Sequence, residues 1–280
     1  MEKRGIDISR YQGKPDFSKL KNEVDFVIVQ AGYGRYASQV DAEFERNYAE
    51  CRKNGIPVGA YWFSYASTPD EARLEAQACR AVIKGKKFEY PIYFDIEGAA
   101  CSGDVSGKCR AFCNELEKAG FFAGIYISRS PAQTYLDDYC CKHYALWFAE
   151  YGSRLNWTGG VGMWQNSSTG HFSGISGNVD TDICYEDYPK IIKQGGYNGY
   201  PKADPKPLDT EAWYRKGNKD KDGEHAIFAI KQRLKALGCK VDDTGGFGGG
   251  TETAVKELQQ SWGFEPTGEI GENFVKRVMK

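Results

Sequence analysis

Tyr90-Pro91-Ile92-Tyr93-Phe94-Asp95-Ile96-Glu97 begins as an apolar run and ends in two acids, and a glycine follows. This pattern is typical of a buried strand that ends in a loop. Because side chains alternate along a strand, Asp95 and Glu97 are expected on one face and Ile92, Phe94 and Ile96 on the other. Repulsion between neighbouring carboxylates raises one pKa, so that one acid stays protonated near neutral pH while the other is ionised. Cleavage of a glycosidic bond needs this pair, although Asp-x-Glu alone also fits a solvated strand end or a cation site.

Strand and helix patterns alternate along the first 190 residues, which predicts a parallel barrel. Helical patterns near 41–54, 69–84 and 105–119 separate the early strands, and the second is expected to start with Thr68 as its cap and Pro69 at the first helical position. The last four strands follow one another more closely, which leaves little room for helices between them. We therefore expect an α/β fold, an irregular and compact (β/α)8-like barrel followed by a small three-helix domain. The expected strands are 5–10, 26–32, 57–65, 91–97, 123–129, 144–150, 161–166 and 179–185.

Acidic residues recur where the strands of such a barrel would meet, at their carboxyl-terminal ends. Strand one offers Asp7, strand four offers Asp95 and Glu97, and strand eight offers Asp180 and Asp182. Acids from three distant segments are hard to explain as ordinary surface charge. Aromatic and amide residues at matching positions are expected either to line a sugar-binding cleft or to pack in the core. These are Tyr33, Tyr61, Tyr126, Trp147 and Gln165.

Composition excludes several classes of function. With 280 residues, 27% charged residues and a formal net charge of −1, the chain reads as a globular protein with one large domain or one plus a small one. Near-neutral charge argues against nucleic-acid binding, and no apolar run is long enough for a membrane span. The start of the chain lacks a signal-peptide pattern, so synthesis in the cytoplasm without export by that route is expected.

The cysteines and glycines do not predict a cofactor or a metal site. The nine cysteines are odd in number and Cys140-Cys141 are adjacent, which favours free, mostly buried thiols over a disulfide framework. No Cys-x-x-Cys pair is present, so we expect no structural metal. The glycine-rich run 245–250 is not followed by Gly-Lys-Ser/Thr, and we expect no phosphate-binding loop there.

Six segments in order resemble the glycoside hydrolase family 25 lysozymes, the muramidases of bacterial peptidoglycan. The resemblance covers residues 5 to about 190. It implies a barrel with an acidic pocket that hydrolyses the β-1,4 bond after N-acetylmuramic acid. It also implies that Glu97 is the proton donor, that Asp95 assists it, and that Asp7 and Asp180 line the same pocket. The segments are Gly5-Ile6-Asp7-Ile8-Ser9-Arg10-Tyr11-Gln12-Gly13, Val58-Gly59-Ala60-Tyr61-Trp62-Phe63, Tyr93-Phe94-Asp95-Ile96-Glu97, Leu146-Trp147-Phe148-Ala149-Glu150-Tyr151, Trp164-Gln165 and Gly177-Asn178-Val179-Asp180.

The residue composition of the chain changes after Lys193. We expect the catalytic barrel at 1–194, a linker rich in glycine and proline at 195–223, and a helical domain at 224–280. The last part has helical spacing up to Gly238, a second helix capped by Thr251 and a third at 272–279. It resembles the three-helix peptidoglycan-binding module of wall hydrolases, with a non-binding domain packed on the barrel as the alternative. Such a binder would raise the local concentration of substrate.

The mechanism follows from the short spacing of Asp95 and Glu97. Two residues on one strand cannot easily flank a sugar from both faces, so the spacing favours attack by the substrate's own 2-acetamido oxygen. An endo-N-acetylglucosaminidase or chitinase and a catalytically silent wall-binding protein stay open as alternatives. The expected partner is the glycan strand of peptidoglycan, with no nucleic acid and no membrane. A monomer and release to the wall as a phage lysin are expected.

Overall fold

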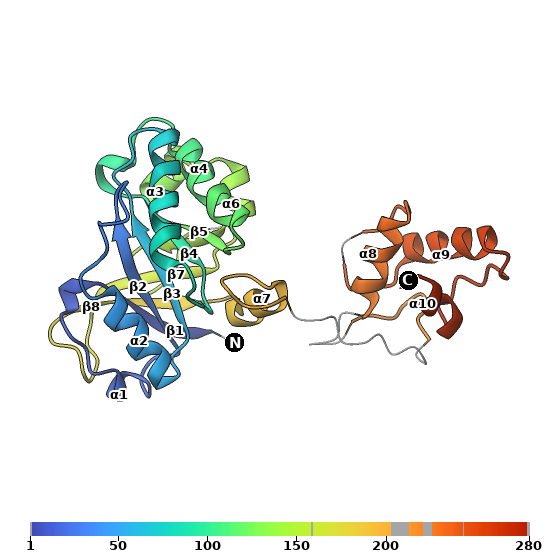
Figure 1. Cartoon of the computed structure of the whole chain (residues 1–280), viewed down its shortest axis with the longest axis horizontal. Coiled ribbons are helices and arrows are strands. Elements are labelled where there is room, and N and C mark those ends of the chain that lie inside the picture. Colours follow the sequence, from blue (N-terminus) through green and yellow to red (C-terminus); the bar gives the residue numbers. More distant parts are fainter. Residues whose placement is uncertain (1, 158, 203–212, 221–225, 243, 279–280) are drawn as a thin grey trace. The chain divides into compact units, whose positions relative to one another are not determined.

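The computed structural model describes residues 2–157, 159–202, 213–220, 226–242 and 244–278. The chain divides into two compact units, residues 1–203 and 204–280 (Figure 1). Residues 203–212 and 221–223 of the expected linker lie outside the described residues, so the linker at 195–223 stays a prediction. Of the described residues in that range, 195–202 belong to the first unit, where Asn198 is buried, and Tyr214 pairs with Ile270 in the second unit.

In the described residues, eight strands close into a barrel in chain order, which confirms the predicted fold class. The expectation that all strands are parallel is wrong, because β8 is antiparallel to both β7 and β1. Only residues 171–178 connect β7 to β8, whereas a parallel return needs a crossover of about a dozen residues or more. The strands are β1 (Lys3–Ile8), β2 (Phe26–Tyr33), β3 (Val58–Phe63), β4 (Ile92–Asp95), β5 (Ala123–Ser128), β6 (Ala145–Ala149), β7 (Met163–Gly170) and β8 (Val179–Cys184).

Helices cover the outside of the barrel, and the three predicted ones are present as α2, α3 and α4. Helix α3 begins as its sequence predicts, with the Thr68 side chain accepting from the Glu71 N–H and proline at the first position. The expectation of little room for helices between the last four strands holds only in part: in the described residues after β6 no helix precedes β7 or β8, but α5 and α6 lie between β5 and β6. The elements are η1 (Arg10–Gln12), α1 (Phe17–Leu20), α2 (Phe44–Asn54), α3 (Pro69–Ile83), η2 (Gly98–Ala100), α4 (Val105–Lys118), α5 (Arg129–Tyr135), α6 (Asp138–His143) and α7 (Tyr188–Gly195).

Strand β4 separates two hydrophobic layers, as the alternation of its residues predicted. Ile92, Phe94 and Ile96 are fully buried between the barrel and its helices, and the Phe94 ring stacks on Phe112 of α4 at 4.3 Å. On the inner side, aromatic rings fill the barrel, and Tyr93 lies 5.1 Å from Trp147 between ring centroids. Gly124 makes room for this packing, since a Cβ there would lie 2.5 Å from the Tyr93 ring.

The second unit contains three helices in its described residues, α8 (Ala226–Ala236), α9 (Gly249–Ser261) and α10 (Glu272–Val278). Buried apolar residues from all three form its core. The prediction that Thr251 caps the second helix is wrong. Helix α9 begins at Gly249 with Gly248 as N-cap, three residues before the predicted cap, and the Thr251 side chain is buried. Glycine serves as an N-cap without a side-chain bond, which leaves the threonine free to face the core.

The cysteines agree with the expectation of free, mostly buried thiols. All nine cysteines are free and six of them are buried. Burial in apolar surroundings raises the pKa of Cys184 to about 12, so this thiol is unreactive at neutral pH. Within the described ranges, no helix has the length and apolar character that crossing a membrane requires.

Candidate active site

The end of β4 presents two acids in different environments. Asp95 is the last residue of the strand, its side chain is 6% exposed, and it pairs in register with Phe63 and Tyr126. Its backbone oxygen accepts from the Ser64 N–H at 2.9 Å. Glu97 follows in extended backbone as the first residue before η2, and it is exposed. One carboxyl is therefore fixed inside the barrel mouth and the other reaches solvent.

Four acids from three strands influence one another here, and we call Asp7, Asp95, Glu97 and Asp180 the acid cluster. Asp7 lies directly opposite Asp180 in the β1–β8 register. Burial, and then Asp180, raises the pKa of Asp7 to about 8. Glu97 is exposed as a whole residue, but its carboxyl group is partly enclosed, and this burial followed by Asp180 raises its pKa. Asp180 belongs to the cluster because β8 is antiparallel, which brings the amino-terminal end of β8 to the carboxyl-terminal ends of the other strands.

The sequence predicted that one acid of the β4 pair would stay protonated. The structure indicates which of the two acids is kept protonated by burial. Burial, followed by Glu97 and Asp7, raises the pKa of Asp95 well above its ordinary value. Among the described residues, Asp95 Oδ1 has no hydrogen-bond partner although it is buried. Because burial penalises the charged form, Asp95 is the more readily protonated of the two. An added donor near Oδ1 would shift the proton toward Glu97.

A chain of hydrogen bonds orients Asp7. Gln165 on β7 donates from Nε2 to Asp7 Oδ2 at 2.8 Å. Tyr126 donates its hydroxyl proton to Gln165 Oε1 at 2.9 Å, and Tyr151 donates to the same oxygen at 3.3 Å. With two hydroxyls on its oxygen, the amide of Gln165 has its NH2 group directed at Asp7. This bond favours the ionised form of Asp7 and opposes the effect of burial.

Asp182 and Trp147 lie deeper in the barrel than the sequence interpretation assumed. Each is 1% exposed, so Trp147 packs in the core, which is one of the two expected alternatives, and Asp182 is enclosed in the barrel. Trp147 Nε1 donates to Asp182 Oδ1 at 2.8 Å. Among the described residues, Asp182 Oδ2 has no hydrogen-bond partner although it is buried. Burial, followed by the charge of Asp7, raises the pKa of Asp182 well above its ordinary value, which favours a protonated carboxyl beside Asp7.

The two other predicted aromatic residues differ in position. Tyr61 is half-buried, its ring meets Trp147 edge-on at 6.1 Å, and burial together with Asp7 and Asp95 raises its pKa. It therefore lies beside the acid cluster. Tyr33 is half-buried at the end of β2, with the Arg10 guanidinium 5.9 Å from its ring centroid. It belongs to the rim of the barrel.

Sequence reasoning missed several exposed aromatic residues in the loops that follow the strands. Tyr11, Tyr65 and Tyr151 come after β1, β3 and β6 and are 78%, 65% and 58% exposed. Each lies within three residues of a strand's carboxyl-terminal end, so a search of those positions for exposed rings would have found them. The described residues contain no group of three or more His, Cys, Asp or Glu that could hold a metal ion.

An exposed carboxyl beside a buried one, with raised pKa values at the open end of a barrel, has the features that acid-catalysed cleavage of a glycosidic bond requires. Comparison with known families agrees with this class. Residues 6–175 match the model of glycosyl hydrolases family 25, and the chain belongs to this family. A separate model, of peptidoglycan binding domains, matches residues 224–278.

Individual relatives resemble the first unit. Lysozyme M1 of Streptomyces globisporus is 28% identical over 203 residues, which cover 63% of this chain and 66% of the relative. The crystal structure of the CTP1L endolysin aligns with a TM-score of 0.62 and 32% identity, over 68% of this chain and 69% of that one. The modular autolysin LytC of Streptococcus pneumoniae, solved with a synthetic peptidoglycan ligand, has a TM-score of 0.59 and 31% identity. That match covers 66% of this chain, which spans about half of the autolysin (47%).

Proposed function

We propose that this protein hydrolyses the β-1,4 bond between N-acetylmuramic acid and N-acetylglucosamine in peptidoglycan. Family membership makes it a glycosyl hydrolase, and relatives of the first unit include a lysozyme and an endolysin. The observation that carries the proposal is the pair at the end of β4, with a buried Asp95 oxygen that lacks a donor and an exposed Glu97.

Glu97 is the general acid in this proposal. It donates its proton to the glycosidic oxygen as the bond from the anomeric carbon to that oxygen breaks. The carbonyl oxygen of the muramic acid 2-acetamido group attacks the same carbon and forms a cyclic oxazolinium intermediate. Water then attacks the anomeric carbon and gives a proton back to Glu97, which restores the acid and retains the anomeric configuration.

Asp95 assists by binding the acetamido N–H. That N–H would donate to the Asp95 carboxylate, which is 6% exposed and whose oxygen Oδ1 has no hydrogen-bond partner among the described residues. A hydrogen-bond donor favours the ionised form of Asp95, and this carboxylate stabilises the positive charge of the intermediate. Of the two acids at the end of β4, Glu97 then carries the proton. Substrate binding therefore prepares both acids for their roles.

Asp7 and Asp180 complete the site on the opposite side of the barrel mouth. Asp7 is held by Gln165, and Asp180 raises the pKa of Glu97, which keeps the general acid protonated. We propose that Tyr61, Tyr33 and the exposed rings after β1, β3 and β6 contact the sugar chain, because aromatic faces pack well on pyranose rings.

The test is to digest purified Gram-positive peptidoglycan, reduce the fragments with borohydride and identify the sugar alcohol at the new ends. Muramitol is expected. Glucosaminitol would instead support an endo-N-acetylglucosaminidase, and no new reducing end would support a silent wall-binding protein. Early NMR spectra of the product should show the retained anomer, and an inverted anomer would contradict substrate assistance.

We also propose that the second unit binds the glycan strands of peptidoglycan and so holds the enzyme at the cell wall. The family match at residues 224–278 supports this role. Residues 224–280 carry eight Lys or Arg and eight Asp or Glu, so recognition does not depend on net charge. Pelleting of the full chain with purified walls tests the proposal, with a chain that ends after the barrel for comparison. Equal binding by both would contradict it.

A further inference from the structure

Lys108 is a fully buried lysine in α4 that the proposed mechanism does not use. Its ammonium donates to three backbone carbonyl oxygens: those of Ala66 at 3.3 Å, Ser102 at 2.8 Å and Ala100. Taking an ammonium out of water is costly unless its protons are satisfied, and Lys108 has three protons to donate. The three carbonyls therefore form a complete set of acceptors around this cation.

The three carbonyls belong to two loops at the open end of the barrel. Ala66 is in the loop after β3, and Ala100 and Ser102 are in the turn after β4. That turn contains η2, which starts directly after Glu97. Within it, Ser102 Oγ donates to the Ala99 oxygen at 2.9 Å. The ammonium of Lys108 thus connects the turn that carries the proposed general acid to its neighbouring loop.

A buried anion holds the same β3 loop from another helix. Glu75 of α3 is fully buried, and it accepts from Ser64 Oγ at 2.7 Å and from the Tyr65 N–H at 2.8 Å. Ser64 Oγ in turn accepts from the Ala66 N–H at 3.1 Å. Two donors of this loop are bonded to a carboxylate from α3, and one of its acceptors is bonded to an ammonium from α4. Glu75 is satisfied by one side-chain hydroxyl and one backbone N–H, and Lys108 by backbone oxygens.

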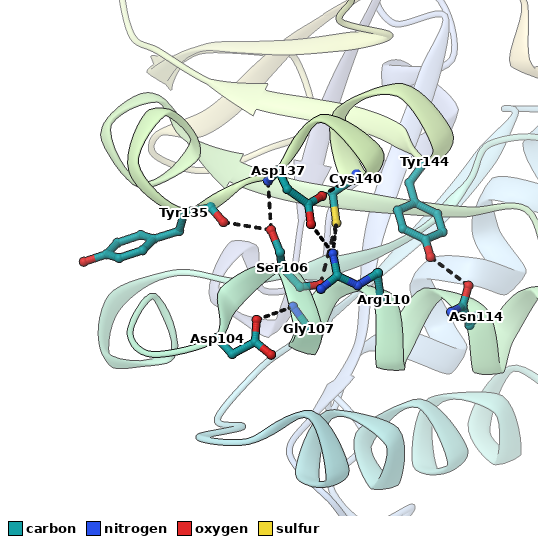
Figure 2. A network of polar contacts seen from close by, with 9 residues as sticks. All are labelled: Asp104, Ser106, Gly107, Arg110, Asn114, Tyr135, Asp137, Cys140 and Tyr144. Atoms are coloured by element: carbon teal, nitrogen blue, oxygen red, sulfur yellow. Dashed lines mark hydrogen bonds and ion pairs between the residues drawn. The ribbon is translucent and has the colours of Figure 1, made fainter.

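The opposite face of α4 is anchored by a second network (Figure 2). Ser106 Oγ donates to the Tyr135 oxygen at 2.8 Å and accepts from the Asp137 N–H at 2.9 Å, and Arg110 pairs with Asp137. Because successive residues turn by about 100°, Ser106 and Arg110 project away from Lys108. The helix is fixed from one side by α5 and α6, so its lysine has a defined position from which to hold the loops.

We propose that Lys108 is a positioning residue for Glu97: its ammonium fixes the turn that begins at Glu97 and so sets where the acid points. This inference rests on the proposed role of Glu97 in catalysis. The ammonium acts through backbone carbonyls and does not touch the substrate. Its loss should lower kcat more than it changes KM, because a misplaced acid affects the transition state more than binding.

The test compares Lys108→Met, which keeps the length of the side chain but has no donor, with Lys118→Met at an exposed position of the same helix. With soluble peptidoglycan fragments, Lys108→Met should lower kcat by roughly 10- to 100-fold and leave KM within about threefold. Hydrogen exchange should become faster in residues 64–68 and 97–102. Lys118→Met should change neither quantity. Wild-type kcat and wild-type exchange in Lys108→Met would overturn the proposal.

A second variant covers the case in which Lys108→Met does not fold. Lys108→Ala removes the atoms that propylammonium can replace, so added propylammonium should restore kcat with saturation, whereas tetramethylammonium, which cannot donate, should not. Failure of propylammonium to restore kcat would overturn the role of the ammonium. The exchange measurement needs no turnover. If the wild-type chain released no muramitol, the proposed function would fail while the effect of Lys108 on the two loops would still be tested.

Discussion

The barrel and the C-terminal unit both contain buried charged side chains, but they balance the charge differently. In the C-terminal unit, the fully buried Lys231 donates to Asp242 Oδ1 at 2.7 Å and to the Thr244 backbone oxygen at 3.0 Å. Hydrogen bonding to Lys231 lowers the pKa of Asp242. In the barrel, the acid cluster holds carboxyls against one another, and burial raises their pKa values.

The contrast separates structural charge from functional charge. The Lys231 pair satisfies a lysine that the fold buries, and the loop that holds Asp242 is fixed by it. The acid cluster carries like charges whose ionisation is opposed by burial and by repulsion, which disfavours the folded state. Crowded acids of this kind are kept where their raised pKa values serve chemistry. The four predictions that follow test the contrast, beginning with the largest expected effect.

Replacing Glu97 with Gln should remove turnover almost completely. The amide keeps the shape of the side chain but has no acidic proton for the glycosidic oxygen, so kcat should fall by about 10²- to 10⁴-fold. The rate of muramitol release from purified walls measures this change in kcat. Glu186→Gln is the matched control, because Glu186 is exposed and follows β8 at the opposite end of the barrel. Undiminished turnover in Glu97→Gln would remove Glu97 from the mechanism.

Replacing Asp182 with Asn should change how barrel stability depends on pH. Asp7 holds its proton up to about 8 in the folded protein but loses it near 3.8 when unfolded, so unfolding free energy falls as pH rises between these values. Asparagine can accept from Trp147 and donate to Asp7, which favours the ionised Asp7. The slope should flatten by up to about 1.4 kcal/mol per pH unit for each proton.

Urea unfolding of the barrel at several pH values measures this slope. The exposed Asp70→Asn variant is the control and should keep the wild-type slope. Equal slopes in Asp182→Asn and the wild type would show that Asp182 does not affect the protonation of Asp7.

Replacing Lys231 with Met should destabilise the C-terminal unit alone. The variant loses the hydrogen bonds to Asp242 and Thr244, at a cost of about 2 kcal/mol for a buried charged donor. Calorimetry should show a lower Tm for that unit and an unchanged barrel transition. Lys240→Met, at an exposed position of the same unit, should leave both transitions in place. A shift of the barrel transition would contradict the independence of the two charge arrangements.

The smallest effect is expected from salt on wall binding. Because positive and negative residues are equal in number in residues 224–280, screening should change the affinity for walls by less than about threefold as the Debye length falls from about 30 to 10 Å. The Glu97→Gln chain is suitable for this pelleting assay, since it binds without digesting the wall. A steep loss of binding with salt would mean that the binding surface collects one sign of charge.

Much of the fold could be predicted because its signals are local. The alternation in β4 predicted which side chains face the helices, and Thr68 followed by Pro69 predicted the start of α3. The direction of β8 could not be read locally, because the residues of a strand look the same whichever way it pairs. The acids at its start suited the open end of the barrel, and only the pairing with β1 shows that its amino-terminal end lies there.

The candidate site, too, has features that could be predicted from the sequence and features that could not. Its acids Asp7, Asp95, Glu97 and Asp180 could be selected from the sequence, since they recur at strand ends. Their environments could not, because burial depends on neighbours distant along the chain, such as Gln165, 158 residues after Asp7. The same limit hid Lys108, which is one of several lysines in a helical pattern until its three carbonyl partners are known.

The sequence by itself therefore determined the order of the eight strands, the helices α2, α3 and α4 and the acids, because periodicity, caps and residue type act over a few residues. The tertiary structure decided the direction of β8, the unequal exposure of Asp95 and Glu97, the burial of Asp182 and the contacts of Lys108. The physical reason is that burial and hydrogen-bond partners are set by packing between segments far apart in the chain, and these set the pKa values on which the chemistry depends.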